Sequence, residues 1–278
     1  MDDRAAAAPT GYVLGDDDPE MARLDALSSL YGPATGAWLD TAGLAPGMAV
    51  ADLGCGPGAV TLAIADRVGA GGRVTGVDAA RRPLEVARRR AAGRPGVAFV
   101  QADVTTWEPP GPLDAVVGRL LLLHLPDPVA LVARAASLVR PGGVVAFADV
   151  VLPTRAAHPP LPLLDAFNGW LLTAFGRLGV PVDAGLRLTA VYRSAGLPDP
   201  VLTCGQPLER GGGATGWAVV AGDAVSLLPA FERTGTATAA EVGAADLGRR
   251  LRAQAAAADA VLVNPLLVGA VARRPGQG

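Results

Sequence analysis

The sequence predicts an α/β fold: a doubly wound, Rossmann-like sheet of seven mainly parallel strands, with helical N-terminal and C-terminal cap insertions. Short apolar runs alternate with amphipathic stretches between residues 45 and 151, which is typical of a parallel sheet covered by helices on both faces. The glycine-rich turn Gly54-Cys55-Gly56-Pro57-Gly58 follows the first apolar run. Ligands bind at such strand ends in this fold class. The 278 residues, half of them hydrophobic, suffice for one large domain.

The central strands and helices are predicted from these alternating patterns. The apolar runs predict strands over Met48–Leu53, Arg73–Asp78, Val97–Ala102, Leu113–Gly118 and Val144–Val151. The stretches between them place apolar residues at helical spacing and predict helices over Gly58–Val68, Arg81–Ala92 and Pro128–Val139. Arg140-Pro141-Gly142-Gly143 is expected to end the last of these helices.

The flanking segments predict a cap. Residues 1–44 are expected to form an N-terminal helical segment or lid, and residues 45–278 an α/β domain with cap insertions near 155–182 and 212–260. The remaining patterns predict helices over 19–43 (two), 161–178, 184–195, 214–233 and 239–258, and strands over Pro200–Leu208 and Leu266–Arg273. Helices inserted before the last strand would cover the ligand-binding end of the sheet.

The composition argues against several classes of protein. The net charge is −2 and all 24 basic residues are arginine, so no general attraction to nucleic acid or to an anionic membrane is expected. Two cysteines and two histidines are too few for a disulfide framework or a Cys/His metal site. No run reaches the roughly 18 apolar residues of a membrane span, and the acidic N-terminus is unlike a signal peptide. We expect a cytoplasmic protein that binds a small-molecule substrate and no metal, nucleic acid or membrane; the helical insertions are compatible with a homodimer.

The glycine-rich turn differs from a dinucleotide-binding fingerprint. Its spacing is Gly-x-Gly-x-Gly, whereas the fingerprint requires Gly-x-Gly-x-x-Gly. Asp52 precedes the turn and would repel a pyrophosphate, but it could orient a cationic amino-acid ligand. The alternative is a tight strand-to-helix turn that binds no ligand.

Two further acids follow the next two predicted strands. Asp78 lies about twenty residues beyond the turn, where an acid can accept hydrogen bonds from both hydroxyls of a ribose. Asp103 follows the third strand in Gln101-Ala102-Asp103-Val104 and could accept a hydrogen bond from the amine of adenine. Each acid could instead cap a helix or a turn. The glycine turn and the two acids together therefore indicate a ligand site more specifically than any one of them.

These motifs resemble those of the class I S-adenosylmethionine-dependent methyltransferases. Beyond the turn and the two acids, the segment from Gly118-Arg119 to His124-Leu125-Pro126-Asp127 resembles the fourth motif of the bacterial small-molecule branch. The resemblance covers about residues 45–151 and implies S-adenosylmethionine as cofactor and S-adenosylhomocysteine as product. The cofactor-binding positions that it implies are Gly54, Cys55, Gly56, Asp78, Ala79, Asp103, Val104, Gly118 and Arg119. Ala79 departs from many relatives, which carry a hydroxyl or a larger side chain there.

The acceptor side of the site is less well defined by sequence. His124 is the candidate base or positioning residue because it follows the fourth strand, although it could also be a cap or packing residue. Arg119 could meet an acidic group of the substrate or pair with a carboxylate of the protein. The candidate substrate contacts are aromatic, and each could instead belong to the core: Tyr12, Tyr31, Phe167 and Trp170.

The expected function is methyl transfer to a small, apolar metabolite, with an oxygen, nitrogen or carbon acceptor, in small-molecule biosynthesis or secondary metabolism. Two other functions stay open, because a fold does not determine a reaction. One is a cyclase, hydroxylase or decarboxylase on the same cofactor-binding fold. The other is a non-catalytic S-adenosylmethionine-binding module.

Overall fold

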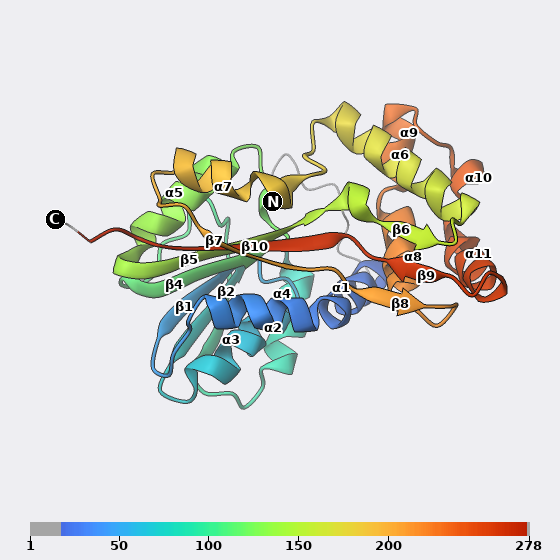
Figure 1. Ribbon diagram of the computed structural model, residues 1–278. Helices are drawn as coiled ribbons and strands as arrows, with labels where there is room; N and C mark the ends of the chain where they lie inside the picture. The colour runs from blue at the N-terminus through green and yellow to red at the C-terminus, as the bar shows by residue number, and fades with distance from the viewer. Residues whose placement is uncertain (1–17, 277–278) are drawn as a thin grey trace, which may run out of the picture.

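The computed structural model describes residues 18–276, and its centre is a seven-stranded sheet with the order β3-β2-β1-β4-β5-β10-β7 (Figure 1). Six strands are parallel to one another, and β10 runs antiparallel to its neighbours β5 and β7. The sheet confirms the predicted fold class. Its strands are β1 (Ala49–Leu53), β2 (Arg73–Asp78), β3 (Val97–Gln101), β4 (Leu113–Arg119), β5 (Val139–Val151), β7 (Val201–Gly205) and β10 (Leu266–Arg273).

Helices cover both faces of this sheet, as its almost uninterrupted apolar strands require. On one face lie α2 (Gly32–Thr41), α3 (Ala59–Val68) and α4 (Arg81–Arg90), and on the other lie α5 (Pro128–Leu138) and α7 (Ala184–Ser194). Trp38 of α2 and Ile64 of α3 are buried in the first layer. Leu131 of α5 and Tyr192 of α7 are buried in the second.

The two predicted insertions meet in one cap beyond the carboxyl ends of the parallel strands (Figure 1). The cap contains a three-stranded antiparallel sheet with the order β6-β9-β8. The predictions missed this sheet because each of its strands has only three residues. The cap elements are β6 (Ala156–His158), α6 (Pro162–Leu178), β8 (Leu208–Arg210), α8 (Gly216–Ser226), α9 (Leu228–Thr234), α10 (Ala239–Val242), α11 (Ala244–Ala257) and β9 (Val261–Val263).

The cap has a hydrophobic core of its own. The predicted apolar face of α6 is buried there, with Leu164, Phe167 and Leu171 at most 2% exposed. These side chains pack with residues of α8, α9 and α11. The two insertions therefore share one core.

The N-terminal helix α1 (Asp18–Leu30) links the sheet and the cap. It lies along α8 of the cap and leads directly into α2, which covers the sheet (Figure 1). Residues 1–17 of the predicted N-terminal segment lie outside the described residues. None of the helices described between residues 18 and 276 is both long and apolar enough to cross a membrane.

Several predicted boundaries were wrong. The helix expected over 128–139 ends at Leu138, because Val139 is extended and pairs with Leu113 as the start of β5. The register then shifts before Ala115 pairs with Val144, so Arg140–Gly143 forms an irregularity within the strand.

Three segments predicted as continuous are divided. The strand expected over 200–208 ends at Gly205, and Leu208 belongs to the cap sheet. The helix expected over 214–233 breaks at Leu227, and Pro229 then stands in the first turn of α9. The helix expected over 239–258 breaks at Gly243, whose φ of +56° does not fit a right-handed helix.

Candidate active site

The glycine turn after β1 offers one exposed stretch of backbone. Gly54, Gly56 and Gly58 all have positive φ, at +67°, +50° and +85°. A Cβ on Gly54 would lie 2.9 Å from Leu121, and one on Gly58 would lie 3.0 Å from Ala87. A Cβ on Gly56 would meet nothing within 4 Å. Gly56 is therefore the glycine of this turn at which a ligand can approach the backbone, and Gly54 is tightly packed.

Asp78 at the end of β2 joins this turn to the start of α4. One carboxylate oxygen accepts a hydrogen bond of 2.8 Å from the amide of Gly56, and the other accepts one of 2.9 Å from the amide of Ala80. Burial raises the pKa of Asp78, and the amides of Ala80, Gly56 and Ala79 oppose that rise. Each oxygen can still accept one more hydrogen bond, because a carboxylate has about four acceptor sites. The geometry thus fits both the structural role and the two hydroxyls of a ribose.

Asp103 forms a turn after β3. Its Oδ1 accepts hydrogen bonds from the amide and the hydroxyl of Thr105, at 2.8 and 2.7 Å. Val104 is buried beside it, whereas Asp103 is exposed. Because both bonds go to Oδ1, the turn leaves Oδ2 accessible to an amine such as that of adenine.

Two groups beneath the turn are buried and do not face a ligand-sized space. Asp52 is 1% exposed and accepts a 2.6 Å hydrogen bond from the hydroxyl of Thr61 on α3. Burial raises the pKa of Asp52 to about 7, although Thr61 and Arg119 oppose the rise. Burial likewise raises the pKa of the Cys55 thiol. Asp52 therefore supports the turn from below and does not meet a cationic ligand directly.

The end of β4 lies beside the glycine turn. Gly118 pairs with Leu53 of β1, and a Cβ on Gly118 would lie 2.6 Å from the ring of Phe147. Arg119 comes next and is half-buried. Leu120 then adopts a φ of +56°, which is rare for a leucine and costs about 1–2 kcal/mol. Such strain tends to gather at functional sites.

His124 ends the short 3-10 helix η1 (Leu122–His124) that follows this turn of the chain. It is half-buried. Burial, together with the smaller effect of the nearby Arg23 cation, lowers its pKa to about 4. A neutral imidazole at physiological pH is thus expected, because this pKa lies well below the ordinary value of 6.5.

Asp149 holds η1 in place and was missed by the sequence analysis. It is fully buried on β5, and its Oδ2 accepts a 3.2 Å hydrogen bond from the amide of Leu123. Burial raises its pKa to about 7. A single acid inside the apolar run Val144–Val151 was the available signal. Asp149 is therefore a positioning residue for the segment that carries His124.

A buried polar cluster joins α1 to the cap. Arg23 of α1 forms an ion pair with Glu20 and another, at 3.3 Å, with Asp223 of α8. Asp223 also pairs at 3.3 Å with Arg155, which donates a 2.7 Å hydrogen bond to Asn168 of α6. Glu20 and Arg23 are one helical turn apart, but no local pattern predicts the rest of the cluster, because its other members are distant in the sequence.

The predicted substrate contacts separate in the structure. Tyr31 is fully buried and donates a 2.8 Å hydrogen bond to the carbonyl of Pro265. It lies within electrostatic range of Arg155 and Arg119. Phe167 lies in the cap core, edge-on to Phe231 and 5.1 Å from the Arg155 guanidinium.

The structure says less about the other two candidate substrate contacts, Trp170 and Tyr12. Trp170 is half-buried against the cap core. Tyr12 lies outside the described residues. Tyr31 is thus the aromatic candidate within electrostatic range of Arg119, whereas the contacts of Phe167 favour the alternative that it is a core residue.

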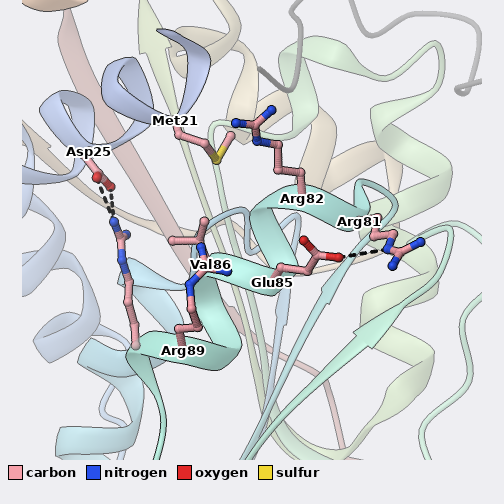
Figure 2. A pocket seen from close by; sticks show the side chains of 8 residues that line it. Met21, Asp25, Arg81, Arg82, Glu85, Val86 and Arg89 are labelled. Carbon is pink, nitrogen blue, oxygen red and sulfur yellow. Dashed lines mark hydrogen bonds and ion pairs between the residues drawn. The ribbon is translucent and has the colours of Figure 1, made fainter. Parts of the chain in front are cut away.

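A separate hollow of about 790 Å³ lies between α1 and α4 (Figure 2). One of its lining residues, Arg81, is three residues beyond Asp78. More arginine than acidic side chains line the hollow. Two ion pairs cross or border it, Arg90 with Asp25 at 2.7 Å and Arg81 with Glu85 at 2.9 Å. The glycine turn does not line this hollow.

Comparisons with known proteins agree with this geometry. A family described as "Methyltransferase domain" matches residues 50–143, from β1 to the start of β5. The chain is 41% identical over 108 residues to trans-aconitate 2-methyltransferase of Rhizobium leguminosarum, covering 39% of this chain and 40% of that protein. It is 40% identical over 119 residues to ubiquinone biosynthesis O-methyltransferase of Paracidovorax citrulli, covering 41% and 48%. These similarities support a class I S-adenosylmethionine-dependent methyltransferase domain over residues 50–143.

The family match extends from the turn-bearing strand β1 to the start of β5 and so includes the predicted cofactor-binding motifs. The chain spans about half or less of the length of the curated relatives that it matches. Over its whole length, the fold resembles that of the 4+2 cyclase SpnF, with a TM-score of 0.55, 18% identity and coverage of 98% of both chains. This last similarity concerns the fold alone.

Proposed function

We propose that the chain transfers a methyl group from S-adenosylmethionine to a small acceptor with an apolar body. The observation that carries this proposal is the open backbone of Gly56, held by Asp78 at the edge of the sheet that the cap covers. The relatives support a small acceptor, since their names refer to trans-aconitate and to ubiquinone biosynthesis.

The residues present fit the proposed cofactor. The amino-acid portion would lie against the Gly56 backbone, where no side chain intervenes. Asp78 would accept hydrogen bonds from the ribose, and Asp103 would accept one from the adenine amine while Val104 packs beside it. The chemistry that S-adenosylmethionine supplies when bound is an electrophilic methyl group on a sulfonium.

The protein's own contribution would be orientation and the exclusion of water. Holding two reactants in line can supply about 7–11 kcal/mol of a reaction barrier. The cap lies beyond the carboxyl end of the sheet, and its buried core is apolar. The neutral imidazole of His124 can accept a hydrogen bond from the acceptor, but a pKa of about 4 makes it a weak base. Its proposed role is therefore positioning.

Two measurements test the proposal. Calorimetry with EDTA present should show micromolar binding of S-adenosylmethionine and S-adenosylhomocysteine, about −8 kcal/mol. Incubation with S-adenosylmethionine and a panel of small phenols, amines and acids should then release S-adenosylhomocysteine with at least one of them. The absence of both heat and a thermal shift with either cofactor form would contradict the proposal.

The same measurements separate the two other functions. A cyclase, hydroxylase or decarboxylase on this fold would bind the cofactor but leave it unconsumed while converting a substrate. A non-catalytic module would bind it and convert nothing.

A further inference from the structure

Arg119 is a half-buried cation at the proposed site of methyl transfer, and among residues 18–276 it has no direct counter-ion. It follows Gly118 at the end of β4, beside the glycine turn. Its guanidinium donates hydrogen bonds to the hydroxyls of Thr35 and Ser28, at 2.8 and 3.4 Å. Both partners are neutral. Within residues 18–276, no carboxylate lies within ion-pair distance of it.

The neighbouring charges do not neutralise it. Asp52 lies within electrostatic range, but it forms no ion pair with Arg119, and Thr61 occupies one of its oxygens. The other arginines near the site, Arg23 and Arg155, are already paired with Asp223. Arg119 therefore carries the unbalanced positive charge of this region.

An uncompensated charge away from water is costly, so such a site favours a ligand that brings the missing anion. The guanidinium has five N–H donors in a planar fork, and the bonds to Thr35 and Ser28 use only part of them. A carboxylate matches both the single positive charge and the fork.

We propose that Arg119 binds a carboxylate of the methyl acceptor, so that the acceptor is an organic acid with an apolar body. The proposal rests on the proposed function, because it assigns the chemistry of the substrate at that site. A carboxylate could also come from the methionine portion of the cofactor, and the experiment below separates the two sources.

The test uses acids and their neutral amides as probes. Benzoate and octanoate are titrated into the wild-type chain by calorimetry and thermal shift, with and without saturating S-adenosylhomocysteine, alongside benzamide and octanamide. We expect the acids to bind at least tenfold more tightly than the amides. Arg119→Gln should remove this preference, and Arg119→Lys, which keeps the charge but not the fork, should retain part of it.

Arg67→Gln is the matched control. Arg67 is also half-buried and also bonds to α2, through the carbonyl of Gly36 and the carboxylate of Asp40. Arg67→Gln should leave the preference for acids unchanged. A general loss of stability would instead lower acid binding in both Arg67→Gln and Arg119→Gln.

A second arm measures S-adenosylhomocysteine and 5′-methylthioadenosine, which lacks the carboxylate. The proposal requires that Arg119→Gln change neither affinity by more than about twofold. A tenfold loss for S-adenosylhomocysteine alone would assign Arg119 to the cofactor and overturn the proposal. Acids that bind no better than amides, or equally well to Arg119→Gln, would also overturn it. Failure of the wild-type chain to bind either cofactor form would instead count against the proposed function, because the acids are also titrated without it.

Discussion

The carboxylate of Asp78 accepts a hydrogen bond from the amide of Gly56 at 2.8 Å, which makes the end of β2 and the turn after β1 one structural unit. The same carboxylate holds the amide of Ala80 at 2.9 Å. Asp78 therefore has a structural role as well as the role in ribose binding that we propose.

Asp78→Ala should weaken S-adenosylhomocysteine binding by about 1.5–3 kcal/mol and also lower the melting temperature, because two amides lose their acceptor. Asp78→Asn keeps one acceptor oxygen and should lose less of both. Calorimetry and thermal unfolding measure the two effects. Asp25→Ala, which removes an exposed partner of Arg90, is the control and should leave cofactor binding unchanged. If Asp78→Ala lowers stability alone, the acid is only a structural cap.

Gly56→Ala should reduce cofactor binding far more than stability. The positive φ of +50° makes alanine unfavourable by about 1 kcal/mol, and the new methyl group would occupy the open space beside the backbone. Gly235→Ala provides the same backbone cost, at a φ of +63° with nothing within 4 Å, at the end of α9 in the cap. Both variants should melt at similar temperatures, and only Gly56→Ala should lose binding at least tenfold. Equal binding by the two would place the ligand elsewhere.

The elements that the sequence predicted well are those with strong local patterns. Strand β2 was predicted with the observed bounds, because turn residues flank its short run around Val74 and Val77. The cofactor-side acids were found because they follow such strands directly. By contrast, β8 pairs with β9 across more than fifty residues, and neither strand exceeds three residues.

The acceptor side depends on contacts that no local pattern encodes. Arg155 and Asp223 are 68 residues apart in the chain and meet only because the segment before β6 lies beside α8 in the cap. The pKa of His124 follows from burial and from Arg23 of α1, more than a hundred residues earlier. Asp149 could have been found as the lone acid in an apolar strand, but its partner Leu123 could not.

The pH dependence of activity should show no His124 step near neutrality. Its pKa of about 4 keeps the imidazole neutral above about pH 5, so any loss from its protonation should be centred near pH 4. His124→Ala should reduce turnover at least tenfold without changing cofactor affinity. His124→Asn should retain most activity, because a positioning residue needs a hydrogen bond and no proton transfer.

His158→Asn is the control for these His124 variants, since His158 is exposed on β6 of the cap. It should leave turnover and its pH profile unchanged. A wild-type step near pH 6–7 that disappears in His124→Asn would contradict the positioning role and make His124 a general base.

Asp149 should make the protein less stable as the pH rises from about 4 to 7. Burial raises its pKa to about 7 in the folded chain, whereas the unfolded chain has an ordinary value near 4. Between these values the folded state keeps a proton that the unfolded state has released, so the stability that this group contributes is complete at low pH and is lost as the pH passes through the folded pKa. Asp149→Asn removes the titration while keeping an acceptor for the amide of Leu123.

The free energy of unfolding of Asp149→Asn, measured by urea denaturation at several pH values and compared with that of the wild type, should therefore rise by about 2–4 kcal/mol between pH 4.5 and 7.5. Asp52, whose pKa is also raised to about 7, titrates in both proteins and cancels in the difference. Asp199→Asn is the control, because Arg193 lowers the pKa of this exposed carboxyl, and its difference from wild type should be small and of opposite sign. A constant difference for Asp149→Asn would mean that Asp149 is ionised in the folded protein. In that case the amide of Leu123 would donate its hydrogen bond to a charged carboxylate, and a buried negative charge would hold η1, the segment that carries His124.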